Sequence, residues 1–117
     1  MFSALLPKLI SLTSVTGEAI MSLQNKSADF IVKSDSTPLT QADNTSHNLI
    51  TDALDKITPD IPILSEESKE TSFSVRKKWQ KYWLIDPLDG TRDFIEGSNE
   101  FCINIAFIEN NYPVFGL

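Results

Sequence analysis

Apolar residues at helical spacing mark two segments of the chain. Between residues 5 and 23 they recur every three or four positions, which predicts a long amphipathic helix. A second helix is predicted from about Asp43 to Ile57, because Asp43 is a favourable N-cap residue and Thr58-Pro59 is a stop signal.

Shorter apolar runs predict strands. They lie at residues 30–32, 61–65, 82–86, 101–109 and 113–117. The last two runs are expected to form an antiparallel hairpin, because Asn110-Asn111 between them is a two-residue turn that tolerates positive φ. Lys69 to Gln80 shows no firm period and is expected to be a mobile loop. The pattern predicts an α+β fold in one domain, residues 1–117, with two helices packed on a mostly antiparallel sheet.

Charge narrows the class of partner. The formal net charge is −6 at pH 7, which argues against a general nucleic-acid surface. The basic stretch from Arg76 to Lys81 contains Trp79 and has two interpretations: a nucleic-acid patch with an interleaved aromatic, or a solvated loop before the next strand. The loop is the favoured interpretation, and no nucleic-acid partner is expected. An acidic protein that handles phosphate esters would need cations to neutralise its ligand.

Cysteine usage and the N-terminus favour the cytoplasm. Cys102 is the only cysteine, so no intrachain disulfide is possible and a reducing compartment is favoured. Its place in an alternating strand predicts a packing role rather than a reactive one. The apolar N-terminus is interrupted by Pro7 and Lys8, and no stretch reaches the ~20 apolar residues of a membrane span. His47, the only histidine, is expected to be a surface or capping residue.

The segment from Asp86 to Thr91, Asp-Pro-Leu-Asp-Gly-Thr, holds the main candidate chemistry. Hard cations such as Mg²⁺ bind carboxylate and carbonyl oxygens, and a helix N-terminus can hold a phosphate. Pro87 restricts Asp86 to an extended conformation, and Gly90 lets the backbone approach a ligand closely. Thr91 can cap the next helical turn and orient a water. The alternative is an ordinary turn, since Asp, Pro and Gly are common turn residues.

Two earlier segments carry polar residues of the same kind. Ser65-Glu66-Glu67-Ser68 follows an apolar run and supplies acids at the end of a predicted strand. Asp43, in Thr40-Gln41-Ala42-Asp43, is either an ordinary N-cap or a preorganised group at a pocket edge, and both can hold. If carboxylates from these segments converge, their repulsion should raise their pKa values without metal.

Together these segments resemble the signature of the inositol-monophosphatase superfamily of Mg²⁺-dependent, Li⁺-sensitive phosphatases. The resemblance rests on Asp-Pro-Leu-Asp-Gly-Thr followed by Phe94, on Glu-Glu-Ser and on Thr-x-x-Asp. It implies the N-terminal half of a layered α/β sugar-phosphatase fold. It also implies an Mg²⁺ site whose ligands are Glu66, Asp86, the Leu88 carbonyl and Asp89.

The resemblance further implies roles in the hydrolysis of a small phosphate ester. Asp43 and Thr91 would activate the attacking water, and Glu66 would be both a metal ligand and a catalytic group. The amides of Gly90 and Thr91 would hold phosphate oxygens. Lys33 would approach a bound phosphate, the alternative being a surface lysine.

Two stretches favour one branch of the superfamily. The segment from Lys33 to Thr40, with Asp35 and Pro-Leu-Thr, and the segment Arg92-Asp93-Phe94-Ile95 resemble the 3'(2'),5'-bisphosphate nucleotidases of sulfur assimilation. The implied substrate is 3'-phosphoadenosine 5'-phosphate, which would give AMP and phosphate. The first alternative is an inositol monophosphatase or a sugar-bisphosphate phosphatase. The second is a catalytically inactive cation-binding or interaction module.

One departure from the family pattern limits these expectations. Family members are longer and carry a third metal-binding aspartate in a Trp-Asp element. Here Trp79 is followed by Gln80 and Trp83 by Leu84. The chain is therefore expected to hold a half-site with little activity by itself. Its last apolar strand, Val114 to Leu117, is expected to promote self-association.

Overall fold

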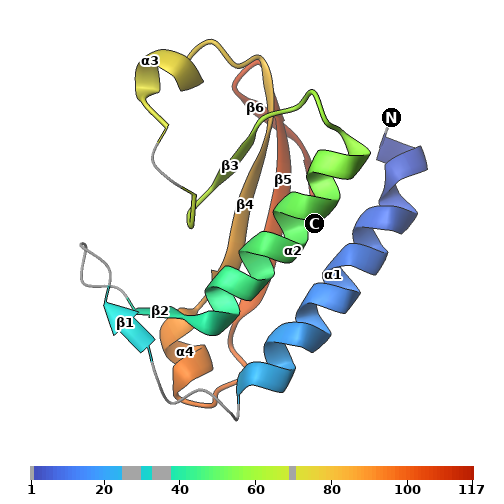
Figure 1. Cartoon of the computed structure of the whole chain (residues 1–117). Helices are drawn as coiled ribbons and strands as arrows, with labels where there is room; N and C mark the ends of the chain where they lie inside the picture. Colours follow the sequence, from blue (N-terminus) through green and yellow to red (C-terminus); the bar gives the residue numbers. More distant parts are fainter. Residues whose placement is uncertain (1, 25–29, 33–37, 69–70) are drawn as a thin grey trace.

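The computed structural model describes residues 2–24, 30–32, 38–68 and 71–117. Its helices are α1 (Phe2–Gln24), α2 (Gln41–Ile57), α3 (Phe73–Arg76) and α4 (Thr91–Ile95). Its strands are β1 (Phe30–Val32), β2 (Pro38–Thr40), β3 (Ile63–Ser65), β4 (Lys81–Asp89), β5 (Cys102–Glu109) and β6 (Tyr112–Gly116). The long helices α1 and α2 lie side by side along one face of a sheet (Figure 1). The predicted α+β class is confirmed.

The sheet contains four strands in the order β3-β4-β5-β6. β3 runs parallel to β4, and the other two neighbouring pairs are antiparallel. The hairpin between β5 and β6 turns at Asn110 and Asn111, whose φ angles are 50° and 68°. These angles match the two-residue turn with positive φ at both positions, so the predicted hairpin and the mostly antiparallel sheet are both confirmed.

The core lies between the two long helices and the sheet. Its fully or almost fully buried members come from α1, α2, β4 and β5: Leu9, Ile50, Leu54, Trp83, Ile85, Ile105 and Phe107. The Trp83 indole N–H donates to Thr58 Oγ1 at 2.9 Å, which satisfies its polar atom at the end of α2. A smaller cluster of Ile20, Ala42, Leu88 and Phe94 joins the far end of α1 to α4. This second cluster anchors the end of β4, where the candidate chemistry lies.

Two predicted boundaries were wrong. The stretch expected to be a loop contains the short helix α3, in which the Ser72 carbonyl accepts the N–H groups of Val75 and Arg76. Lys69 and Glu70 lie outside the described residues. β4 also begins at Lys81 and continues to Asp89, because it pairs with β5 up to Asp86 and again at Asp89, after a register shift.

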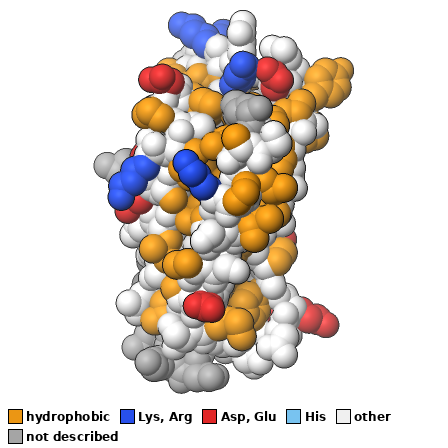
Figure 2. All heavy atoms as spheres, turned by 90° about the vertical axis from the view of Figure 1, so that its right-hand side faces the viewer, with side chains coloured by type: hydrophobic (Ala, Val, Ile, Leu, Met, Phe, Trp, Pro, Cys, Tyr) orange, Lys and Arg blue, Asp and Glu red, His pale blue; other side chains and the backbone are white. Residues whose placement is uncertain are grey.

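Apolar side chains are exposed on α1 and around β6. Figure 2 shows such side chains over much of the height of the face that lies to the right in Figure 1, with basic and acidic side chains scattered among them. The exposed apolar residues of these two regions include Leu6, Ile10, Val15, Met21, Val114 and Leu117. None of the helices in the described ranges is both long and apolar enough to cross a membrane.

This exposed surface predicts that the chain associates in solution, since apolar patches and open sheet edges recruit other chains. Sedimentation velocity should show a mean mass that increases with protein concentration. Replacing Val114 and Leu117 by Lys should shift the protein toward monomer, whereas Phe73→Lys, an exposed apolar position on α3, should not. A monomer at every concentration would contradict the prediction.

Candidate functional site

The parallel pairing of β3 and β4 brings the acidic segments together. Ser65 lies opposite Ile85, and the N–H of Glu66 donates to the Ile85 carbonyl at 3.3 Å. Because both strands run in the same direction, their carboxyl ends meet, and the Glu66 and Asp86 side chains are within hydrogen-bonding contact. Asp89 adds a third carboxylate close enough to act on Asp86 electrostatically. The predicted convergence of Glu66, Asp86 and Asp89 is therefore present.

The environment of Asp86 favours its protonated form. The pKa of Asp86 is raised from 3.8 to about 6, mainly by burial and further by the charge of Glu66, a hydrogen bond with Glu66 and the charge of Asp89. A hydrogen bond from the Leu88 backbone acts in the opposite direction. One oxygen of Asp86, Oδ1, is buried without a hydrogen-bond partner. The predicted rise in carboxylate pKa is confirmed for Asp86.

This raised pKa predicts a pH-dependent stability of the metal-free protein. The folded state binds the Asp86 proton more tightly than the unfolded state, so Asp86 lowers stability as pH rises from about 4 through 6. Asp86→Asn should therefore raise the melting temperature at pH 7 and leave it nearly unchanged at pH 4. Since Asp86 is only half-buried, solvent screening reduces the effect to about 1 kcal/mol, or ~3–5 °C. Thermal unfolding at both pH values tests this, and equal shifts would contradict it.

The donor set fits a hard divalent cation. In the described ranges, no three His, Cys, Asp or Glu side chains are already arranged to hold a metal ion. The unpartnered Asp86 oxygen and the repulsion between the neighbouring carboxylates are nevertheless the features that a cation would relieve. The available ligands are oxygens. Hard cations such as Mg²⁺ and Ca²⁺ prefer oxygen ligands, whereas softer metals prefer sulfur or nitrogen.

The turn after Asp86 is held by contacts outside the sheet. The ladder between β4 and β5 shifts register between Asp86 and Asp89, and the Pro87 carbonyl accepts a hydrogen bond from the buried Ser46 hydroxyl. Gly90 has a φ of 90°, and a Cβ there would meet the Glu100 carbonyl at 2.7 Å. The glycine therefore permits close approach to the chain's own backbone at Glu100, and its predicted close approach to a ligand stays a prediction.

Asp43 and Thr91 form a direct contact. The Thr91 hydroxyl donates to Asp43 Oδ1 at 2.9 Å, and more weakly to the Leu88 carbonyl at 3.3 Å. Asp43 is fully buried and also accepts the Thr40 hydroxyl at 2.7 Å and the Thr40 N–H at 2.9 Å on Oδ2. The structure thus brings together the two residues that the sequence paired.

Two capping predictions were wrong in detail. The N-cap of α2 is Thr40, and Asp43 is the partner in a capping box one turn into the helix. The helix therefore begins at Gln41 rather than Asp43. The N-cap of α4 is Gly90, which has no side chain to cap the helix, and the Thr91 hydroxyl, which was predicted to cap it, donates to Asp43 instead.

Two further contacts near the site were not predicted. His47 is half-buried, and its Nδ1 lies 2.8 Å from Ser65 Oγ, which also accepts the Glu67 N–H at 3.2 Å. Ser46 holds the Pro87 carbonyl. Both residues lie one turn beyond Asp43 and therefore on the same face of the helix. This spacing was the sequence signal that could have placed them near the site. The surface or capping role expected for His47 did not include this hydrogen bond to Ser65.

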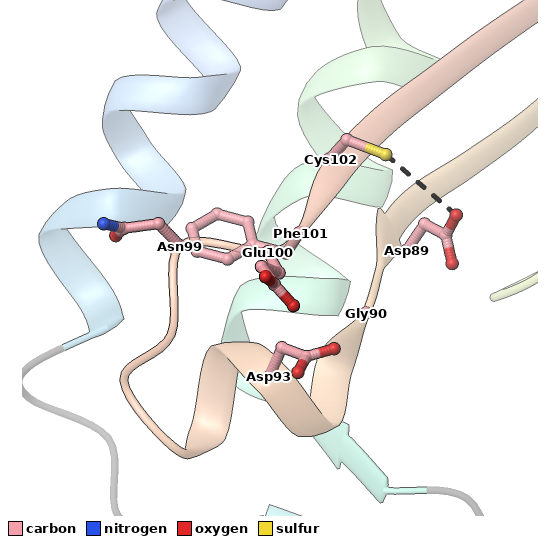
Figure 3. A pocket seen from close by; sticks show the side chains of 7 residues that line it. All are labelled: Asp89, Gly90, Asp93, Asn99, Glu100, Phe101 and Cys102. Carbon is pink, nitrogen blue, oxygen red and sulfur yellow. Dashed lines mark hydrogen bonds between the residues drawn. The ribbon is translucent and has the colours of Figure 1, made fainter.

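The start of β5 completes the surroundings of Asp89. The Asn104 amide donates to Asp89 Oδ2 at 3.4 Å, and the Cys102 thiol lies 4.0 Å from the same oxygen. Cys102 is exposed, so its predicted packing role was wrong. Asp89, Asp93, Glu100 and Cys102 line an open cavity of about 370 Å³, and Figure 3 shows how these side chains lie. Lys33, the predicted phosphate contact, lies outside the described residues.

The site is thus an oxygen-rich cluster at the ends of two parallel strands, beside a buried Asp-Thr pair. Residues 4–117 match the Inositol monophosphatase family, and the chain belongs to that family. Its curated relatives include the 3'(2'),5'-bisphosphate nucleotidase CysQ of Escherichia coli O6:H1, 44% identical over 115 residues. Another is the CysQ of Haemophilus influenzae, 36% identical over 113 residues. The matches cover 97% of this chain but 46% and 42% of those relatives, so the chain spans about half their length.

Solved structures support the fold. CysQ from Bacteroides thetaiotaomicron has a TM-score of 0.71 at 40% identity, covering 90% of this chain and 37% of that chain. The extragenic suppressor protein SuhB from Bartonella henselae has a TM-score of 0.83 at 25% identity, covering 97% of this chain and 43% of that chain. The expectation of this family is therefore confirmed.

Proposed function

We propose that the protein containing this chain is an Mg²⁺-dependent phosphomonoesterase that removes the 3'-phosphate of 3'-phosphoadenosine 5'-phosphate. The observation that carries the proposal is the hydrogen bond from Thr91 to the buried Asp43. The Thr91 hydroxyl also contacts the carbonyl of Leu88, a residue of the turn between Asp86 and Asp89. A group that can activate water is thereby joined to the turn that carries two of the proposed carboxylate ligands.

In this proposal the cations are held by Glu66, Asp86, the Leu88 carbonyl and Asp89. When bound, Mg²⁺ would neutralise the phosphate and lower the pKa of a water. The amides of Gly90 and Thr91 hold phosphate oxygens at the start of α4.

Thr91 has the geometry to position the attacking water. Its hydroxyl proton is directed to Asp43, so its oxygen lone pairs are available to accept a hydrogen bond from a water. Asp43 is locked by two hydrogen bonds from Thr40 and so fixes the rotamer of Thr91. As Thr91 takes a proton from the water, its own hydroxyl proton passes to the Asp43 carboxylate, which leaves a hydroxide to attack the phosphorus.

The substrate part of the proposal is supported by the CysQ relatives, which are named as bisphosphate nucleotidases. Phosphate release from 3'-phosphoadenosine 5'-phosphate and from inositol 1-phosphate should be compared in a protein of the relatives' length that carries these residues. Preference for the nucleotide is expected. Preference for inositol 1-phosphate would favour the inositol-phosphatase alternative, and cation binding without turnover of either would favour an inactive module.

The 117 residues by themselves are proposed to turn over the nucleotide far more slowly than that longer protein. The ligands proposed among the described residues are Glu66, directly after β3, and three groups of β4, and a two-metal clamp on both the attacking and the leaving oxygen needs more. The reducing, cytoplasmic setting that the single cysteine favours stays a prediction.

A further inference from the structure

The first two turns of α2 present three polar side chains toward the site. Asp43, Ser46 and His47 are spaced three and four residues apart, so they share one face of the helix. Asp43 holds Thr91, as described above. Ser46 and His47 each contact the end of a different strand, so both can hold a segment of the site in place.

Ser46 holds the end of β4. Its side chain is fully buried, and its hydroxyl donates to the Pro87 carbonyl. Pro87 lies where the β4–β5 ladder shifts register, so no residue of β5 pairs with it. A buried carbonyl requires a donor, and Ser46 supplies it from another element. The contact therefore fixes the backbone between the two carboxylates Asp86 and Asp89.

His47 holds the end of β3. Its Nδ1 lies 2.8 Å from the Oγ of the buried Ser65, the residue directly before Glu66. The same oxygen accepts the N–H of Glu67 at 3.2 Å. The hydroxyl of Ser65 therefore ties both sides of Glu66 to α2, and His47 fixes the direction in which the Glu66 segment leaves the strand.

We propose that Ser46 and His47 are positioning residues that hold the Glu66 segment and the Asp86–Asp89 turn at the separation needed to share a cation. The inference rests on the proposed function for the identity of the ligand, a divalent cation. It assigns to α2 a role beyond water activation: the helix sets the geometry of a site whose ligands lie on two strands. Losing such outer contacts typically weakens metal affinity about 10–100-fold.

Mg²⁺ calorimetry on the 117-residue chain tests this with Ser46→Ala and His47→Leu. Each is expected to weaken affinity about 10-fold. His47→Gln, which keeps a hydrogen-bonding group, should recover most of the loss. Ser22→Ala is the matched control for Ser46→Ala, since the Ser22 hydroxyl also donates to a backbone carbonyl, that of Ala19, but on the exposed part of α1. Its affinity should equal that of the unchanged protein.

Amide hydrogen exchange on the metal-free chain separates this inference from the proposed function. His47→Leu should speed exchange at Glu66 and Glu67 about 10-fold or more, while core amides such as Ile105 stay protected. A chain that binds no Mg²⁺ would refute the proposed metal centre, and the exchange rates would still decide whether α2 positions these segments. Unchanged exchange at Glu66 and Glu67 in His47→Leu, or unchanged affinity in both folded variants, overturns the positioning role.

Discussion

Asp86→Asn is expected to weaken Mg²⁺ binding by the chain about 100-fold or more. Asp86 lies between the other two carboxylates, and its unpartnered Oδ1 is the oxygen best placed to gain from a cation. Loss of an outer contact alone typically costs about 10–100-fold in metal affinity, so loss of a direct ligand should cost at least as much. Isothermal calorimetry at neutral pH measures the difference.

Asp60→Asn is the matched control, because Asp60 is an exposed acid beyond the end of α2 and its replacement removes the same charge. Its Mg²⁺ affinity should be unchanged. Equal binding heats for the unchanged chain and Asp86→Asn would remove Asp86 from the proposed site. A loss of equal size in Asp60→Asn would instead indicate a general effect of net charge.

Thr91→Ala is expected to reduce turnover by ~10²–10⁴-fold, the usual range for the loss of general acid–base work. Its hydroxyl connects the buried Asp43 to the turn that follows Asp86. Cation affinity should change little, because Thr91 is proposed to position water rather than to bind the metal. Turnover and Mg²⁺ affinity should both be measured in a protein of the relatives' length.

Thr91→Ser keeps the hydroxyl and should retain most of the activity. Thr13→Ala removes a comparable hydroxyl from α1, where it donates to the Ile10 carbonyl, and should have no effect. A Thr91→Ala enzyme with the unchanged rate would show that Thr91 does not position the water. A parallel loss of metal affinity would show that Thr91 supports the cation site instead.

The sequence by itself determined the local elements. The 3.6-residue period of apolar positions is a property of one segment, so α1 and α2 could be located without knowledge of their partners. The hairpin followed from Asn110-Asn111 in the same way, since a two-residue turn with positive φ depends on those two residues. The resemblance of the Asp86–Thr91 motif to a known family was also a local match, and the family comparison confirmed it.

Only the tertiary structure decided which polar groups meet. Thr91 reaches Asp43 across 48 positions, a pair that the family resemblance implied but local pattern could not, and Ser46 reaches Pro87 across 41, a contact that no pattern in the sequence predicted. The capping preference of Asp43 predicted that Asp43 would be the N-cap of the second helix. In the structure Thr40 is the N-cap, and Asp43 is its partner in the capping box. The exposure of Cys102 and the raised pKa of Asp86 likewise depend on neighbours that folding brings near. Local preference is set by a few adjacent residues, whereas burial and charge coupling act through space between segments that are distant in the chain.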